Sequence, residues 1–120
     1  MKSIIEITER IREFCDKRGW SHSNPTGLLT ATFSELGELA EHYQWQKEFK
    51  KFSEEEKKEI SYEFVDVFWY LFRLADKSGI DIEKAFEEKF PKLEKKFPIG
   101  CDPKKQHEIY RKNGKNRLYE

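Results

Sequence analysis

The stretch SYEFVDVFWYLFRLA, residues 61–75, decides how the chain can fold. It contains no Gly or Pro and is far longer than an ordinary strand, so it predicts a helix despite its aromatic and β-branched residues. At about 100° per residue, apolar side chains surround most of this helix, and its most apolar face comprises Phe64, Phe68, Leu71, Phe72 and Ala75. Such a helix in a soluble protein is expected to be buried on most sides, as the central element of a bundle.

Two acids interrupt this apolar helix. Glu63 and Asp66 are three residues apart, so they share one face of the helix, next to Tyr70. An unpaired carboxylate in a protein interior costs several kcal/mol, or its pKa shifts until the group is neutral. The pair therefore predicts a bound cation, an acid–base role, or both.

Length and charge limit the classes of function. With 120 residues the chain is expected to form one domain, small enough to complete its burial by forming oligomers. Its 23 basic and 23 acidic residues cancel, so neither nucleic acid nor a membrane is expected as a partner. Cys15 and Cys101 lack metal-type spacing, and the sequence shows neither a signal peptide nor a run of about 18 apolar residues. We therefore expect reduced thiols in a cytoplasmic protein.

Helix signals divide the rest of the chain. Apolar periodicity and end signals predict helices at about 3–18, 26–48, 54–78 and 82–96. Pro91 is expected to kink the last of these helices or to end it early. After Pro98 the chain is polar, basic and rich in turn residues, which indicates a tail that is ordered only if something holds it. The predicted organisation is an oligomeric, all-α, four-helix bundle-like domain at 1–98 with a basic C-terminal tail at 99–120.

Two stripes of side chains run along the second predicted helix. We expect its core stripe to consist of Leu29, Phe33, Leu36, Ala40 and Tyr43. A second stripe, about 100° to 160° away, consists of Leu28, Glu35, Glu38 and His42. Glu35 and Glu38 thus repeat the three-residue spacing of Glu63 and Asp66 on a helix that has a separate apolar face.

Two antiparallel helices with such pairs can bring four carboxylates to one place. Their mutual repulsion in a low dielectric would amount to several kcal/mol, so the arrangement favours a divalent metal site. Ligands that are all oxygen favour Mg²⁺ or Mn²⁺ over zinc. The alternative is that Glu35 and Glu38 lie on a solvated flank, while lysines or helix ends satisfy Glu63 and Asp66.

A carboxylate-bridged di-iron bundle is a rival metal site. Its helices supply Glu and Glu-x-x-His ligands. Here His42 follows Glu38 by four residues, the helix predicted at 54–78 holds no histidine, and the other two histidines lie in the predicted loop and tail. This distribution argues against iron and favours His42 as a partly exposed side chain.

Two motifs carry a resemblance to a known family. SELGELAEHYQW at 34–45, followed by EFVDVFWYL at 63–71, resembles the E-x-x-E … E-x-x-D pattern of the all-α nucleoside triphosphate pyrophosphohydrolases, the MazG-like superfamily. The run GELAE-x-x-QW and the preceding GWSHSNPTGLL are similar to the dCTP pyrophosphatase branch. The resemblance covers roughly 4–98. It implies a small α-bundle that forms dimers or tetramers and a Mg²⁺-dependent cleavage between the α and β phosphates, which releases monophosphate and pyrophosphate.

The resemblance also implies roles for particular residues. The metal-binding and catalytic acids of the family correspond to Glu35, Glu38, Glu63 and Asp66. Aromatic positions around the base and sugar correspond to Trp20, Trp45 and Tyr70, and a lysine near the phosphates corresponds to Lys89. We expect Glu35 to act on the attacking water and the other three acids to bind mainly the metal ions.

The chain departs from this branch at two places. The loop after Trp20 is one residue shorter than in the animal enzymes, so His22 is a candidate substrate contact without a matched position. Leu93 stands where the branch has an asparagine, four residues after the lysine near the phosphates. This change removes an expected phosphate contact and leaves the preference for dCTP open. The basic tail either replaces the lost phosphate contacts or is simply solvated.

Two tryptophans lie outside the expected core. Trp20, beside His22 in a loop, forms either a plug over the end of the bundle or part of a pocket wall, and Trp45 falls near Glu38 on the helical wheel. Flat apolar rings suit stacking on a nucleotide base. The alternative is that both rings fill a subunit interface.

The function predicted from these observations is a Mg²⁺-dependent nucleotide pyrophosphohydrolase that acts on deoxycytidine-type or modified triphosphates. The alternative function is a non-catalytic helical interaction module, in which the acids form buried ion pairs with residues such as Arg73 and Lys77.

Overall fold

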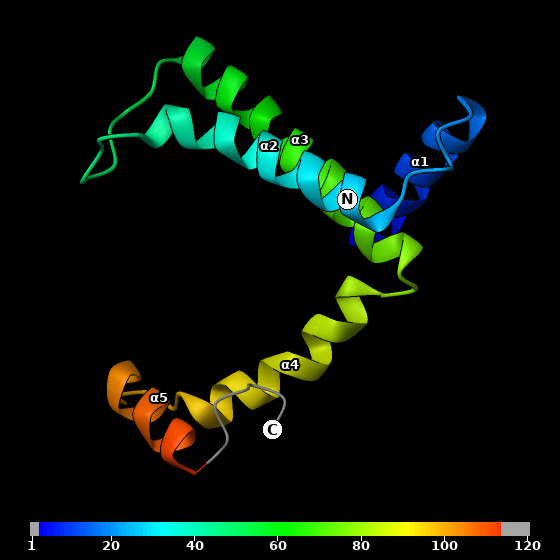
Figure 1. Ribbon diagram of the computed structural model, residues 1–120. Coiled ribbons are helices and arrows are strands. Elements are labelled where there is room, and N and C mark those ends of the chain that lie inside the picture. The colour runs from blue at the N-terminus through cyan, green and yellow to red at the C-terminus, as the bar shows by residue number, and fades with distance from the viewer. Residues whose placement is uncertain (1–2, 114–120) are drawn as a thin grey trace. The chain divides into compact units, whose positions relative to one another are not determined.

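Helices account for all the regular secondary structure that the computed structural model describes, which covers residues 3–113 (Figure 1). They are α1 (Ile4–Lys17), α2 (Pro25–Tyr43), α3 (Glu54–Lys77), α4 (Ile82–Lys96) and α5 (Pro103–Lys112). The predicted all-α class is confirmed. The chain divides into two compact units, the first ending at Ile80 and the second beginning at Asp81. None of the helices in the described range combines the length and hydropathy that a bilayer-spanning segment needs.

Local sequence signals set most of the helix ends. The Ser53 hydroxyl accepts the backbone N–H of Glu56, and the Glu56 carboxylate accepts the N–H of Ser53, which forms a capping box at the start of α3. Asp81 caps α4 in the same position. Helix α2 ends at Tyr43, five residues before the predicted end, because Trp45 adopts a left-handed backbone with a φ of 69° and the Gln46 side chain donates to the carbonyl of His42.

In the first unit, α3 packs along α2 and, over a shorter length, against α1. Helix α2 turns Leu28, Thr32 and Leu39 inward, on the side that carries Glu35. The predicted core stripe of α2 was therefore misplaced, since Leu29 and Leu36 are exposed and Phe33 is 65% exposed. The acidic stripe faces α3, and the more apolar stripe is left uncovered.

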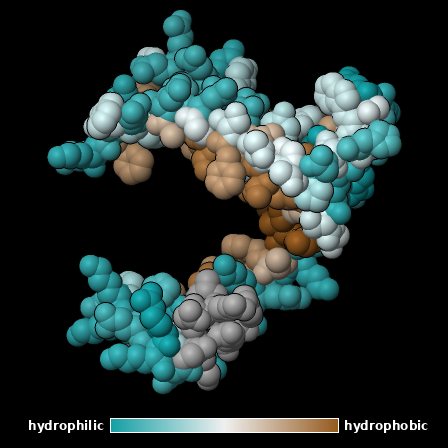
Figure 2. Space-filling model, in the orientation of Figure 1, coloured by the Kyte–Doolittle hydropathy of each residue, from teal (hydrophilic) through white to brown (hydrophobic). Residues whose placement is uncertain are grey.

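Helix α3 is also less buried than expected. Phe64, Val65, Phe68 and Leu71 are all exposed, and the buried residues of α3 are Ile60 and Arg73. The prediction of burial on most sides is wrong for the single chain, because α1 and α2 cover only part of the helix surface. Figure 2 shows the resulting apolar patch along the α2–α3 pair.

The second unit contains α4 and α5. Helix α4 continues through Pro91 to Lys96, so the proline does not end it early. Helix α5 forms within the segment that was expected to be a tail. Lys96 is only 1% exposed, with its Nζ 3.3 Å from Nδ1 of His107 and 5.2 Å from the ring centroid of Tyr110, and these contacts hold α5 on α4. The assignment of 1–98 as one functional domain stays a prediction.

Candidate metal centre

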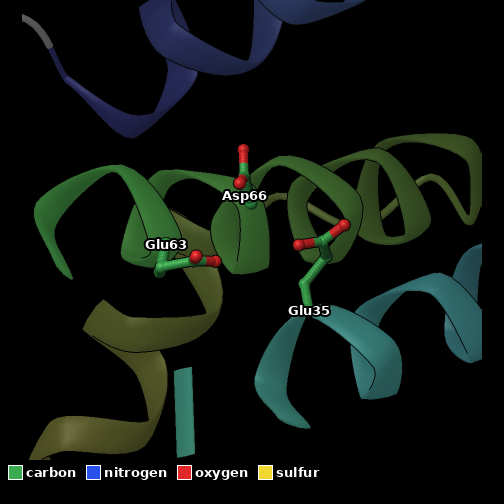
Figure 3. A group of neighbouring side chains, drawn as sticks. All are labelled: Glu35, Glu63 and Asp66. Atoms are coloured by element: carbon green, nitrogen blue, oxygen red, sulfur yellow. The ribbon is translucent and has the colours of Figure 1, made fainter. Parts of the chain in front are cut away.

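Three acidic side chains from two helices converge in the first unit. Glu35 projects from α2, and Glu63 and Asp66 project from α3 (Figure 3). One carboxylate oxygen of each lies within 4.8 Å of the others, in a cluster that could hold a metal ion. The sequence spacing produces this convergence, because the i, i+3 pair on α3 shares a face and the stripe carrying Glu35 is the side of α2 that packs against it.

Glu38 lies beside this cluster. After burial, the negative charge of its carboxylate is the next cause that raises the pKa of both Glu35 and Glu63. It does not belong to the group whose oxygens lie within 4.8 Å of one another. The structure therefore groups three of the four predicted acids most closely and places the fourth next to two of them.

Burial and like charges both act on Glu35 and Glu63, whereas Asp66 is exposed. The pKa of Glu35 is raised first by burial, then by the charge of Glu38 and, more weakly, by Asp66 and Glu63. The pKa of Glu63 is likewise raised first by burial and then by Glu38 and Asp66, while His42 lowers it. A cation among the acids would stabilise their charged forms.

The Glu63 carboxylate has an unsatisfied oxygen. Its Oε2 is buried and has no hydrogen-bond partner, although buried oxygens of this kind are nearly always paired. Its Oε1 lies 3.9 Å from Nε2 of His42. An orphaned carboxylate oxygen inside an all-oxygen cluster fits a hard divalent cation such as Mg²⁺ or Mn²⁺. His42 is outside the cluster, so the donor set does not match the Glu-x-x-His pattern of a di-iron bundle.

The predicted aromatic contacts lie in different places. Trp20 packs edge-on against Phe14 of α1, with 5.9 Å between ring centroids, and remains 52% exposed. His22 is exposed in the α1–α2 loop. Trp45 follows the end of α2 and is 90% exposed, so it contributes nothing to the core of the described chain. Tyr70 lies one turn after Asp66 on α3 and is half-buried.

Lys89, the remaining predicted substrate contact, is exposed on α4 in the second unit. Its relation to the acidic cluster stays a prediction. So does the role of the basic residues of α5, which carries Lys104, Lys105, Arg111 and Lys112.

Arg73 and Lys77, the partners that the alternative function gives to the acids, bond to the loop between α1 and α2. Arg73 donates to the carbonyl of Trp20 at 2.6 Å, and Lys77 donates to the carbonyl of Ser21 at 2.5 Å. Within the described residues, the recorded side-chain contact between a basic group and the cluster is that of His42 with Glu63. The interaction module with Arg73 and Lys77 as partners of the acids is therefore not supported.

Sequence reasoning underestimated His42 and did not consider Gln46. His42 lies one turn beyond Glu38 on the acidic stripe of α2, a position from which its contact with Glu63 could have been foreseen. Gln46 lies one further turn along, and its buried Oε1 has no partner although its Nε2 donates to His42. Because the chain is no longer helical after Tyr43, a helical wheel does not place Gln46 correctly.

Comparison with known proteins agrees with the predicted family and with the all-α fold. The sequence pattern of the MazG-like family matches residues 31–113. The chain is 30% identical over 102 residues to dCTP pyrophosphatase 1 of Rattus norvegicus, which covers 81% of this chain and 60% of the relative. It is 32% identical over 101 residues to dCTP pyrophosphatase 1 of Homo sapiens, covering 80% and 59%.

A crystal structure of a pyrophosphatase from Archaeoglobus fulgidus superposes with a TM-score of 0.64 and 33% identity, covering 82% of this chain and 94% of that one. The chain spans about 60% of the length of the dCTP pyrophosphatase relatives. Because the family pattern spans the acidic helices and continues through α5, the chain belongs to the MazG-like family.

Proposed function

We propose that this protein is a divalent-metal-dependent nucleoside triphosphate pyrophosphohydrolase, which cleaves dCTP-like or modified nucleotides to the monophosphate and pyrophosphate. The observation that carries the proposal is the convergence of Glu35, Glu63 and Asp66 from two packed helices. The family match and the names of the relatives support the reaction class. The role in the cell would be removal of unwanted nucleotides from the precursor pool.

The acids would hold Mg²⁺, or Mn²⁺ in its place. When bound, the ion neutralises phosphate charge and so makes the α phosphorus accessible to a nucleophile. Glu63 and Asp66 are assigned to the metal because they share a face of α3 and because Glu63 has an unpaired buried oxygen. Glu38, beside them, is assigned to the same task.

Glu35 is assigned to the attacking water. A carboxylate can accept a proton from water more readily when its pKa lies closer to neutrality. Burial and the neighbouring acids raise the pKa of Glu35, which suits this role. Its position on α2 would let it approach the water from the side opposite the ligands on α3.

The remaining candidates would bind the nucleotide. Trp20, Trp45 and Tyr70 offer aromatic surfaces for the base and sugar, His22 a polar contact, and Lys89 a charge for the phosphates. Trp45 is the most exposed of the three aromatic residues in the single chain, so its ring is free for a ligand or for a second subunit. Base preference for deoxycytidine belongs to this proposal and rests on the relatives.

A homodimer or homotetramer forms part of the same proposal. Apolar side chains of α2 and α3 that this chain leaves uncovered form the surface: Leu29, Phe33, Leu36, Phe64, Phe68 and Leu71. A groove of about 330 Å³ between α1 and α3 adds Phe14, Trp69 and Phe72 to the apolar surface. An exposed apolar area of this extent marks an interaction site, and we assign it to a second copy of the chain.

The protein is proposed to act in the cytoplasm. Cys15 and Cys101 are both free thiols, and Cys15 is buried. Free thiols suit a reducing compartment.

Incubation of the purified protein with a panel of ribo- and deoxynucleoside triphosphates and Mg²⁺ tests the proposal. Equimolar monophosphate and pyrophosphate should form, and EDTA should stop the reaction. For variants of the cluster acids, such as Glu63→Gln, the matched control is Glu41→Gln, because Glu41 is an exposed acid on another side of α2. Its activity should equal that of the wild type. No pyrophosphate from any nucleotide would refute the proposed function.

A further inference from the structure

One face of α3 connects the acidic cluster to the loop between α1 and α2. Side chains spaced by three and four residues share this face, and they are Glu63, Asp66, Tyr70, Arg73 and Lys77. The acids lie in the middle of the helix, and the two cations lie in its last turns. The distance along the helix from Asp66 to Arg73 is about 10 Å, at about 1.5 Å per residue. A single rigid element therefore carries both groups.

The cations of this face hold the backbone of the loop. Arg73 is 92% buried, being only 8% exposed, and its Nη2 donates to the Trp20 carbonyl at 2.6 Å. Lys77, one turn further on, donates to the carbonyl of Ser21 at 2.5 Å. The N–H of Trp20 donates to the carbonyl of Cys15 in α1 at 2.8 Å. Both backbone polar groups of Trp20 are thus fixed, one by α1 and the other by α3.

The Trp20 ring is supported on one side and open on the other. Phe14 contacts it edge-on, and Phe14 in turn packs edge-on against Trp69 of α3, with 5.3 Å between ring centroids. About half of Trp20 remains exposed. A ring with a fixed backbone and free surface loses little freedom when a flat ligand stacks on it, which favours binding.

We propose that Arg73 is a positioning residue for the nucleotide. Its guanidinium fixes the Trp20 carbonyl and thereby holds the indole as a stacking surface for the base, at one end of the face whose acids address the phosphates. Lys77 assists by holding the next carbonyl of the same loop. This inference rests on the proposed function, and it adds residues that act through the loop without touching the substrate.

Arg73→Met tests the inference, because methionine keeps much of the buried volume but removes the donors. The KM for the preferred nucleotide should rise about tenfold, the effect of losing one charge-assisted hydrogen bond that prepares the site. The kcat should change by less than about twofold, since the acids are untouched. The Kd of a non-hydrolysable triphosphate should rise by the same factor as the KM.

A double-mutant cycle with Trp20→Ala separates positioning from general stability. If Arg73 acts through Trp20, then Arg73→Met should add little to the rise in KM already caused by Trp20→Ala. Arg12→Met is the matched control. It breaks the neighbouring link between α1 and Asp76 of α3, at 2.6 Å, and leaves the Trp20 carbonyl bonded. It should lower the melting temperature without changing KM.

Several outcomes would overturn the inference. These are an unchanged KM in folded Arg73→Met, additive effects of Arg73→Met and Trp20→Ala, or the same rise in KM with Arg12→Met. If Arg73→Met does not fold, Lys77→Met gives the test at an exposed position, with an expected rise in KM of about threefold. A wild-type protein that releases pyrophosphate while these variants keep its KM would refute this inference and leave the proposed function standing.

Discussion

The Glu63 carboxylate is partly buried, is repelled by neighbouring acids and has an oxygen that is available to a metal ion. One of its oxygens is buried without a partner, and the other lies near His42. Its pKa is raised by burial and by neighbouring acids, so in the metal-free protein its charged form is held at a free-energy cost. The same charge becomes favourable once a cation is bound. Metal binding and metal-free stability should therefore respond in opposite directions to removal of this charge.

Glu63→Gln tests this opposition. Turnover should fall at least about 100-fold, and Mn²⁺ affinity, followed by electron paramagnetic resonance, should fall at least about tenfold. The melting temperature in EDTA should rise by a few degrees, because one of several crowded charges is gone. Asp66→Asn should likewise abolish turnover and keep the helical fold. Near wild-type turnover in either variant would remove these acids from the site.

Asp76 gives a prediction of pH dependence away from the site. Its hydrogen bond with Arg12, at 2.6 Å, lowers its pKa from the ordinary value of 3.8. A carboxyl whose pKa is lower in the folded state stabilises the fold fully above the unfolded pKa and loses this effect as pH falls through the folded pKa. The link between α1 and α3 should therefore weaken below about pH 4.

Asp76→Asn should make the stability of the fold less dependent on pH in the acid range. Above the unfolded pKa the variant should be less stable by no more than about 1 kcal/mol, since Arg12 is half exposed. The difference from the wild type should shrink as pH falls below about 4. Urea unfolding of both proteins at a series of pH values measures this difference in unfolding free energy. A gap that stays constant or widens on acidification would show that the bridge does not stabilise the fold.

At the scale of elements, the exposed ring of Trp45 follows directly after α2, the helix that carries the acidic stripe. The left-handed Trp45 stops the helix, and Gln46 satisfies the carbonyl of His42. Non-glycine residues with a positive φ are uncommon and are often retained at functional positions. Trp45 is 90% exposed and lies outside the described core, so its ring predicts a ligand or a second subunit as its partner.

Trp45→Ala distinguishes a ligand from a subunit as the partner of this ring. If the ring stacks on the base, the KM should rise about tenfold or more, while kcat falls less and the oligomer stays intact. If the ring fills an interface, the oligomer should dissociate, and KM should change only as folded protein is lost. Oligomeric state and KM must be measured on the same sample. An intact oligomer with unchanged KM would remove Trp45 from the pocket.

The helices themselves differ in how far the sequence could predict them. The capping box at Ser53 and Glu56 and the cap at Asp81 act locally, so the starts of α3 and α4 were predictable. The orientation of α2 was not, because two stripes of α2 were both apolar enough to face α3, and the acid-bearing one does. Helix α5 was missed because its stability comes from Lys96 in α4, a contact that no local pattern reveals.

The acidic site was more predictable than the rest of the pocket. Its acids share helix faces through regular spacing, and two packed helices are enough to bring them together. The loop carrying Trp20 is different, since Arg73 and Lys77 fix it through backbone carbonyls that a sequence does not mark. Arg73 and Lys77, which only the alternative function paired with the acids, thus bind the loop backbone.

At the scale of the whole molecule, the uncovered faces of α2 and α3 predict that the chain functions as an oligomer. Sedimentation should show a species larger than the 14.5 kDa monomer at micromolar concentration. Phe33→Ser should shift it toward monomer, because this exposed ring lies in the apolar stripe of α2. Ile99→Ser is the control, being an exposed apolar residue in the second unit. A stable, active wild-type monomer would contradict the assignment of this surface.

In the proposed reaction, the acidic cluster directs water to the α phosphorus of a nucleoside triphosphate. Reaction in ¹⁸O-labelled water with Mg²⁺, followed by mass spectrometry of the products, measures this most directly. Attack of water at the α phosphorus should place one ¹⁸O atom in the nucleoside monophosphate and none in the pyrophosphate, and Glu63→Gln should form neither product. Label in the pyrophosphate, release of inorganic phosphate in its place, or the same products from Glu63→Gln would contradict it.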